Sequence, residues 1–114
     1  PGVSTSTLKI QIMMTPLDPK QVTAALLTLP EWQVLEQAHT NALQRSYRFV
    51  DFMKALDFMN DAAPEIQRLN HHPEWTNVYD QVRVRLTTHD AGDRITAADV
   101  ELAKILDWVA LRFA

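Results

Sequence analysis

An alternating run in the second half of the chain constrains the fold more than any other feature. Apolar and polar side chains alternate over residues 82–87 (VRVRLT). Successive side chains of a β-strand point to opposite faces, so this segment has one apolar face and one polar face. Such a strand is typical of an antiparallel sheet that is covered on one side only. The rest of the chain must supply more strands and a layer of helices.

Apolar residues with helical spacing predict that layer. The first helix is expected within residues 18–30, where an aspartate can cap the helix and a proline suits its first position, and where a second proline ends the run. The second helix is expected over residues 51–69. Pro64 lies inside it and predicts either a kink near Asn60 or a break into two helices, because proline removes an intrahelical hydrogen bond.

The third helix is expected to begin at Thr96, where Asp99 three residues later resembles a capping box, and to continue to Phe113. Further strands are expected over residues 32–37, 42–49 and 75–79, the first two joined through 39–41. The order is therefore helix, two strands, helix, two strands, helix. This order predicts an α+β fold, with a four-stranded antiparallel sheet and about three helices packed on one face.

The composition is that of an ordinary globular domain. The chain has 114 residues, of which 46% are hydrophobic and 22% charged, enough for one packed core. The net charge of −3 and the lack of a basic stripe argue against direct nucleic-acid binding. The chain has no cysteine, which excludes disulfides, thiol catalysis and thiolate metal sites.

Residues 1–13 have neither the long apolar core nor the cleavage site of a secretory signal. We interpret them as an N-terminal extension or tag remnant ahead of one domain spanning residues 14–114. No apolar run approaches the roughly 20 residues needed to cross a bilayer, so no membrane association is expected. Without an export signal, the expected location is cytoplasmic.

Three of the four histidines lie close together in the sequence: His71, His72 and His89. Imidazole titrates near neutral pH, so such a group can supply both an acid and a base. Pro73 favours an extended backbone at His72. Side chains alternate along an extended chain, so His71 and His72 are expected to have different roles. His89 follows the alternating strand, where side chains leave the sheet and become available to a ligand.

Other interpretations of these residues are open. Any one of the histidines could simply cap a helix or strand end. Adjacent histidines lack the one-turn spacing of helical zinc ligands, so no metal site is expected. Trp75 could form a wall for a flat ligand or pack in the core, and Tyr79 is a second aromatic candidate. Capping of a helix would by itself explain Asp99.

A longer motif, which includes these histidines, resembles the signature of a known protein family. The segment HHPEWTNVYDQVRVRLTTH (residues 71–89), followed by Asp99, resembles the signature of the pterin-4a-carbinolamine dehydratases. The pattern consists of a histidine pair with proline, an aromatic residue at Tyr79, a histidine at His89 and the later aspartate. The likeness extends from about Leu17 to the C-terminus.

The resemblance implies an activity. Members of this family dehydrate 4a-hydroxytetrahydropterin to quinonoid dihydropterin, a step in tetrahydrobiopterin recycling, with neither a metal nor a redox cofactor. It implies that His71 and His89 are proton donor and acceptor, in an order the sequence leaves open, and that His72 binds and orients the pterin. The substrate-contacting residues it implies are Asn70, His71, His72, Pro73, Trp75, Thr87, Thr88, His89 and Asp90.

Two positions depart from the family pattern. Gln67 and Asn70 stand where relatives commonly carry acids. Glutamine can still hydrogen-bond a histidine, but neither residue supplies negative charge that would favour an imidazolium. We therefore expect a smaller protonated fraction at neutral pH than in relatives that carry the acids.

The resemblance also leaves a non-enzymatic function open. Animal relatives act as a dimerisation cofactor of a homeodomain transcription factor through a helical surface, which here would be residues 51–69. Other relatives occur beside amino-acid hydroxylases or molybdopterin enzymes. The three histidines favour the enzyme, because a scaffold needs no titrating cluster. Family members form homodimers or homotetramers, so the strand over residues 81–88 would offer a pairing edge if it lies at the side of the sheet.

Overall fold

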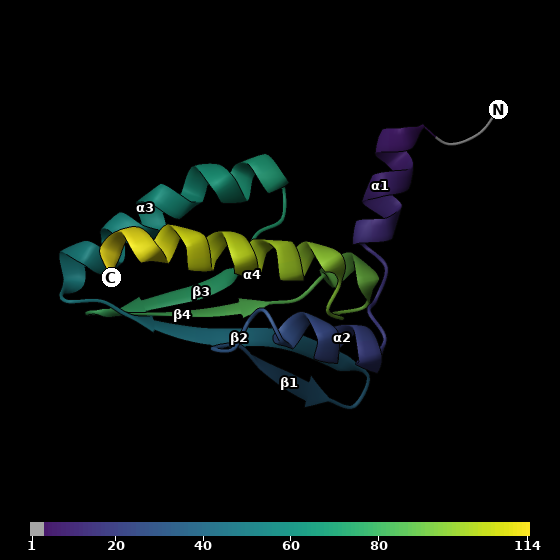
Figure 1. The fold of residues 1–114 in the computed structure, drawn as a ribbon, viewed down its shortest axis with the longest axis horizontal. Coiled ribbons are helices and arrows are strands. Elements are labelled where there is room, and N and C mark those ends of the chain that lie inside the picture. The colour runs from purple at the N-terminus through teal and green to yellow at the C-terminus, as the bar shows by residue number, and fades with distance from the viewer. Residues whose placement is uncertain (1–3) are drawn as a thin grey trace.

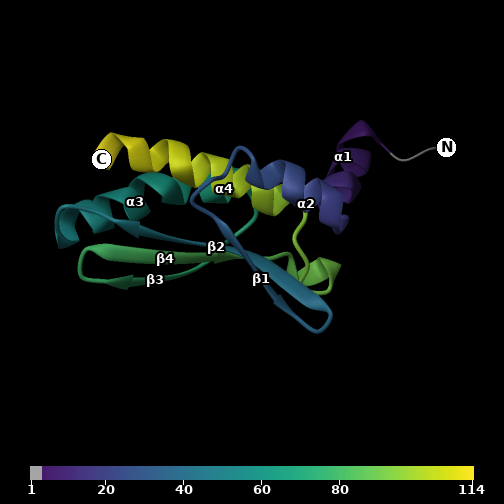
Figure 2. The ribbon, with the colours of Figure 1, turned by 60° about the horizontal axis from the view of Figure 1, so that its bottom comes forward.

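The computed structural model describes residues 4–114. It contains one antiparallel sheet with the strand order β1-β2-β4-β3. The strands are β1 (Gln33–Gln37), β2 (Thr40–Arg48), β3 (Glu74–Val78) and β4 (Gln81–Leu86). Helices α2, α3 and α4 lie on one side of the sheet, and the other side is open (Figure 2). The predicted α+β class and one-sided covering are confirmed.

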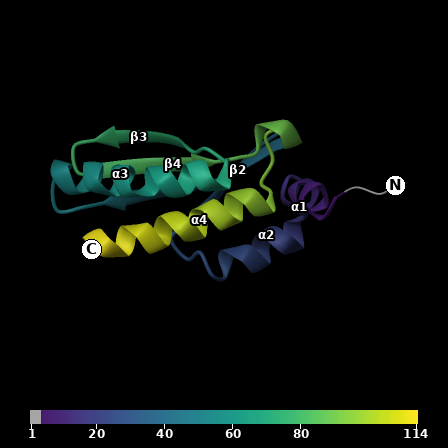
Figure 3. The same cartoon turned by 90° about the horizontal axis from the view of Figure 1, so that it is seen from above.

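The helices are α1 (Thr5–Met13), α2 (Pro19–Leu26), α3 (Phe52–Leu69) and α4 (Ala97–Ala110). Short 3-10 turns cover His89–Ala91 and Leu111–Phe113. Helices α3 and α4 lie side by side above the sheet, and the C-terminus lies at the end of the molecule remote from α1 (Figures 1 and 3). Within the described part of the chain, no helix has the length and apolar character to span a bilayer.

Helix starts follow the local sequence. Asp18 caps α2, and its side chain and that of Gln21 form a reciprocal capping box. Asp51 caps α3 by accepting a hydrogen bond from the backbone of Lys54. The capping box predicted at the start of α4 is present between Thr96 and Asp99.

The core lies between the sheet and its helices. Val82, Val84 and Leu86 of β4 are fully buried, whereas Arg83 is exposed on the open face. Phe58 of α3 is fully buried and packs against aromatic rings from the sheet. The alternation in the sequence therefore separates the covered face from the open face of the sheet, as predicted.

The proline in α3 does not divide the helix. Helix α3 runs without interruption from Phe52 to Leu69 with Pro64 inside it, so the predicted alternative of two helices is wrong. Pro64 is exposed, and the buried face of the helix is formed by other residues, including Ala62 and Ile66. Packing of that face against the core offsets the cost of one missing hydrogen bond.

Several boundaries and the position of one strand differ from the predictions. Helix α2 ends at Leu26, four residues before the proline expected to end it. The turn between β1 and β2 is formed by residues 38–39, since Thr40 and Asn41 already belong to β2. The strand over residues 81–88 was considered as a possible edge, but β4 pairs with β2 on one side and β3 on the other. The edges of the sheet are β1 and β3.

The segment predicted as an N-terminal extension, residues 1–13, is described from residue 4 onward, and residues 1–3 lie outside the described part. Residues Thr5–Met13 form α1, which contacts α4 but has no buried residue of its own. The chain after α1 is held more firmly. Pro16 pairs with Thr96 in an isolated antiparallel bridge, and the Leu17 amide donates to the carbonyl of Ile95 at 2.9 Å.

Candidate functional site

The three clustered histidines meet around one surface depression. Its volume is about 240 Å³, and side chains from three separate segments line it: the stretch after α1, the connection from α3 to β3, and the loop after β4. The lining residues are Met14, Asn70, His71, His72, Thr87, Thr88, His89 and Asp90. Seven of them belong to the predicted substrate-contacting set, and Met14 does not.

His71 is held by a buried carboxylate. Its Nε2 lies 2.6 Å from Oδ1 of Asp99. The His71 side chain is 11% exposed and that of Asp99 is 0% exposed, so little water competes for this contact. Asp99 is on the first turn of α4, and the interaction therefore ties the α3–β3 connection to that helix.

The other oxygen of Asp99 is also fully used. Its Oδ2 accepts hydrogen bonds from the backbone amide of Thr96 at 2.9 Å and from the hydroxyl of Thr88 at 2.7 Å. Buried carboxylates are stable only when hydrogen-bonded, and these donors meet that requirement. Asp99 thus caps α4 and orients His71 at the same time, so the two interpretations of this residue are compatible.

His89 lies in a different environment. Its side chain is 91% exposed, and its Nδ1 lies 2.9 Å from Oδ1 of Asp93. The hydrogen bond and negative charge of Asp93 raise the pKa of His89 above its ordinary value, with a smaller contribution from Asp90. The loop that carries His89 is fixed by backbone hydrogen bonds from residues 91 and 93 to the carbonyl of Thr88.

The departures from the family pattern fall beside His72. Its Nε2 lies 3.1 Å from Oε1 of Gln67, one turn from the end of α3. Asn70 follows that helix in the left-handed conformation, with φ of 54°, which turns the chain toward His71. Asparagine tolerates this conformation better than most residues, so Asn70 has a clear backbone role.

The buried Asn41 forms hydrogen bonds to residues on both sides of the loop that carries His89. Asn41 accepts a hydrogen bond from the Ile95 amide at 2.7 Å through its side chain, and its carbonyl accepts from the Thr87 hydroxyl at 2.8 Å. Its own amide donates to the carbonyl of Asp93. Sequence reasoning assigned Asn41 to a turn. Its side-chain and carbonyl hydrogen bonds join residues more than forty positions away, so no local sequence pattern reveals them.

The two aromatic candidates lie elsewhere. Trp75 packs edge-on against Phe58 with ring centroids 6.4 Å apart, and it does not line the depression. This position favours the core-packing interpretation. Tyr79 lies in the β3–β4 turn, at the far end of the hairpin from the histidines, and is exposed. Pro73 adjoins the site in sequence but is absent from its lining.

Each imidazole has one ring nitrogen engaged by the protein. His71 and His72 use Nε2, and His89 uses Nδ1. The second nitrogen of each ring is left for a ligand or water. A neutral imidazole hydrogen-bonded to a carboxylate donates its N–H to it, and its other nitrogen is then a proton acceptor. An imidazolium, by contrast, has a proton to give.

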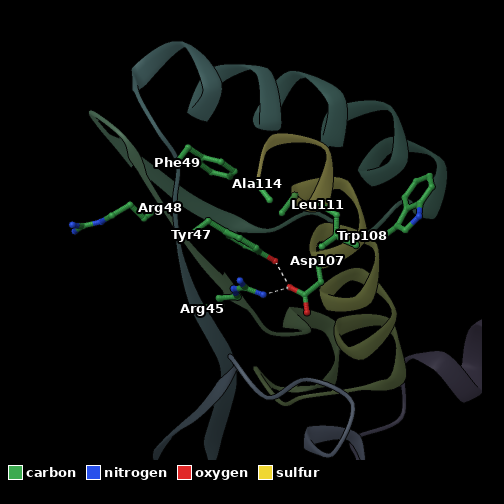
Figure 4. A pocket seen from close by; sticks show the side chains of 9 residues that line it. Arg45, Tyr47, Arg48, Phe49, Asp107, Trp108, Leu111 and Ala114 are labelled. Atoms are coloured by element: carbon green, nitrogen blue, oxygen red, sulfur yellow. Dashed lines mark hydrogen bonds and ion pairs between the residues drawn. The ribbon is translucent and has the colours of Figure 1, made fainter.

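A larger cavity lies near the C-terminal end of α4, and Figure 4 shows its polar wall. Asp107 accepts hydrogen bonds there from Tyr47, from Arg45 at 2.7 Å and from the Trp32 indole at 3.0 Å. Burial and the hydrogen bond to Asp107 raise the pKa of Tyr47 far above its ordinary value. The carboxylate is satisfied from within the protein, which indicates a structural link between α4 and the sheet.

Among residues 4–114, no group of three histidine or acidic side chains is arranged to hold a metal ion.

Comparisons with known proteins identify one family. A family model described as Pterin 4 alpha carbinolamine dehydratase matches residues 15–109. A protein of Opitutus terrae, provisionally named a pterin-4-alpha-carbinolamine dehydratase, is 61% identical over 64 residues, or 56% of this chain and 66% of that protein. A protein of Solibacter usitatus with the same provisional name is 44% identical over 98 residues, which cover 86% and 98% of the two chains.

Solved structures share the architecture. The crystal structure of a transcriptional coactivator/pterin dehydratase from Brucella melitensis has 35% sequence identity and a TM-score of 0.78, and the match covers 84% of this chain and 99% of that one. A pterin dehydratase-like protein identified as a RuBisCO assembly factor in the α-carboxysome is 18% identical, with a TM-score of 0.57 over 70% and 89% of the two chains. The second likeness concerns the fold alone.

Proposed function

Because the chain belongs to the pterin-4a-carbinolamine dehydratase family, we propose that it removes water from 4a-hydroxytetrahydropterins by histidine acid–base catalysis. The observation that carries this proposal is the meeting of His71, His72 and His89 around one depression. Each ring has a nitrogen left for a ligand. A purely structural or regulatory module would not need three imidazoles gathered in this way, so the geometry favours an enzyme over a binding module.

The two reactive histidines are proposed to have opposite roles. His71 donates its Nε2 proton to buried Asp99, so its Nδ1 is the base that accepts the proton from N5 of the pterin. His89 is the acid, since Asp93 favours its protonated form. It protonates the hydroxyl on C4a as the carbon–oxygen bond breaks, and the hydroxyl leaves as water.

The proton balance of this step is complete. One proton leaves His89 and one arrives at His71, while the pterin loses one molecule of water and becomes the quinonoid dihydropterin. Exchange with solvent then returns a proton to the exposed His89 and takes the added proton from His71. His72, held by Gln67, is proposed to bind and orient the pterin. The reaction changes no oxidation state, so the proposal assigns no cofactor.

The test is a stopped-flow assay of carbinolamine dehydration on the parent, His71→Ala and His89→Ala. Each replacement is expected to lower kcat about a hundredfold or more, as for loss of a general acid or base. His39, which lies in the β1–β2 turn and does not line the depression, provides the matched control: His39→Ala should keep the parent rate. Equal rates for all four folded proteins would refute the proposed activity.

Asp99→Asn tests the assignment of the base. The amide keeps the size of the side chain but cannot hold the His71 proton as a carboxylate does, so kcat should fall about tenfold or more. A structural role alone would not change the pH dependence of kcat. The acidic limb of the pH–rate profile, which reports the base, should move in this variant, and an unmoved limb would contradict the role proposed for His71.

A further inference from the structure

The histidine depression adjoins a second cavity. This neighbour has a volume of about 340 Å³, and the two cavities share Met14, Asn70, His71 and Asp90. The remaining walls differ in character. Threonine and histidine side chains complete the depression, whereas Ile10, Met13, Leu69 and Ala98 complete the neighbour. Two adjoining cavities therefore share a wall, with polar residues around the histidines on one side and mainly apolar residues near α1 on the other.

The apolar side is built mainly by the segment before the dehydratase-like region. The match to the family model begins at residue 15, and Ile10, Met13 and Met14 precede it. Met14 is held in place from the other side, because Pro16 pairs with Thr96 and the Leu17 amide bonds to Ile95. Thr96 and Ile95 lie three and four residues before Asp99, the partner of His71. The wall and the base are thus fixed to the same end of α4.

We propose that α1 and Met14 form a subsite for an apolar substituent on the pterin ring, and this inference depends on the proposed dehydratase activity. The flat polar head occupies the histidine depression, and an alkyl group at carbon 6 extends between Met14 and Ile10. Methionine is flexible and polarizable, so it adapts to irregular apolar groups. Ile10 is 62% exposed, so a ligand that covers it removes apolar surface from water.

The subsite makes the chain selective for pterins with an apolar rather than a hydroxylated substituent. The subsite offers the substituent mainly apolar side chains, with Asn70, His71 and Asp90 at the shared boundary facing the ring. A hydroxylated chain would lose hydrogen bonds to water without replacing them there. An alkyl chain loses none, and it removes apolar surface of both partners from water.

The experiment measures kcat/KM for the 4a-carbinolamines of 6-propyltetrahydropterin and of unsubstituted tetrahydropterin. The ratio of the two values is compared among the parent, Ile10→Asp and Ile12→Asp. Ile12 lies on the same helix and is 61% exposed, but it does not line the cavity. We expect the ratio to fall about tenfold in Ile10→Asp, since a charge replaces the apolar wall, and to keep its parent value in Ile12→Asp.

Ile10→Ala provides a second variant that preserves helix propensity, and its ratio should fall by about threefold as apolar contact is lost. Far-UV circular dichroism checks that α1 is retained in each variant. An unchanged ratio in both Ile10 variants, with the parent active, would overturn the subsite alone. A parent that dehydrates neither pterin would overturn the proposed activity, and the subsite with it.

Discussion

Asp93 has the largest influence on the pKa of His89. Asp93 raises the pKa of this exposed imidazole, first through their hydrogen bond and then through its charge. A raised pKa in the folded state means that the pair favours folding at low pH and that its contribution fades as pH rises through the folded value. The imidazolium fraction at neutral pH is correspondingly increased, as a general acid requires.

Asp93→Asn should lower the pKa of His89 toward the ordinary histidine value, and NMR titration of the His89 ring protons would measure this shift. Asp90→Asn is the matched control. Asp90 is the smaller contributor, so its removal should move the titration less. A larger shift for Asp90→Asn than for Asp93→Asn would contradict the hydrogen bond as the main cause.

Gln67→Glu should restore the negative charge that the family pattern carries near His72. The glutamine oxygen already lies 3.1 Å from Nε2, so a carboxylate at that position would favour the imidazolium directly. The pH–rate profile of the variant is expected to shift to higher pH relative to the parent. Superimposable profiles would show that His72 does not titrate in the reaction.

At the scale of single residues, the sequence located the site by its reactive groups but not by their supports. His71, His72, His89 and the threonines beside them line the depression, and their contact with a pterin stays a prediction. Asn41 and Met14 went unnoticed, because neither is reactive and each reaches the site through partners more than forty residues away. The sequence does not decide whether Trp75 forms a wall for a ligand or packs in the core, and its contact with Phe58 favours packing.

Among the secondary-structure elements, α4 has a polar anchor at each end. Asp99 holds the first turn, and Asp107 joins the last turns to β2 through Arg45 and Tyr47 (Figure 4). Trp32, just before β1, donates to the same carboxylate. Asp107 therefore connects three segments of the chain: α4, β2 and the residues just before β1.

Asp107→Ala should lower the free energy of unfolding by about 2–3 kcal/mol, because three donors lose a charged acceptor in a partly buried place. Denaturation by urea would measure it. Asp61→Ala is the control, since Asp61 forms only an exposed ion pair with Arg112 at 3.4 Å and should cost less than about 1 kcal/mol. Equal losses in the two variants would contradict the role of Asp107 as a link between elements.

Element boundaries were predictable where the signal is local. The caps at Asp18 and Thr96 depend on residues three positions away, and both were identified from the sequence. Tertiary packing decided the others. Helix α3 continues through Pro64 because its buried face is long, and no local rule weighs a missing hydrogen bond against burial of Phe58 and Ile66.

At the scale of the whole molecule, the strand order was the part that local patterns could not give. The alternation over residues 82–87 predicted a one-sided sheet but not a central position for β4, because strand order depends on pairing between distant segments. With β4 internal, any association through an edge of the sheet has to use β1 or β3.

The domain boundary proposed at residue 14 can be tested on the whole molecule. A chain spanning residues 14–114 should unfold with a free energy within about 0.5 kcal/mol of the full chain, because α1 contributes no buried residue. Calorimetry of the two proteins would compare them. A substantially less stable shorter chain would mean that α1 belongs to the folding unit.

The shared use of Asp99 limits how this protein can be altered. One oxygen serves the histidine and the other serves the start of a helix. A substitution of Asp99 that changes the basicity of His71 would therefore also destabilise the start of α4. Adaptation to a more acidic or alkaline setting therefore has a safer route at the exposed His89, because the half-exposed side chain of Asp93 bonds this ring, and asparagine can replace it at the same left-handed backbone.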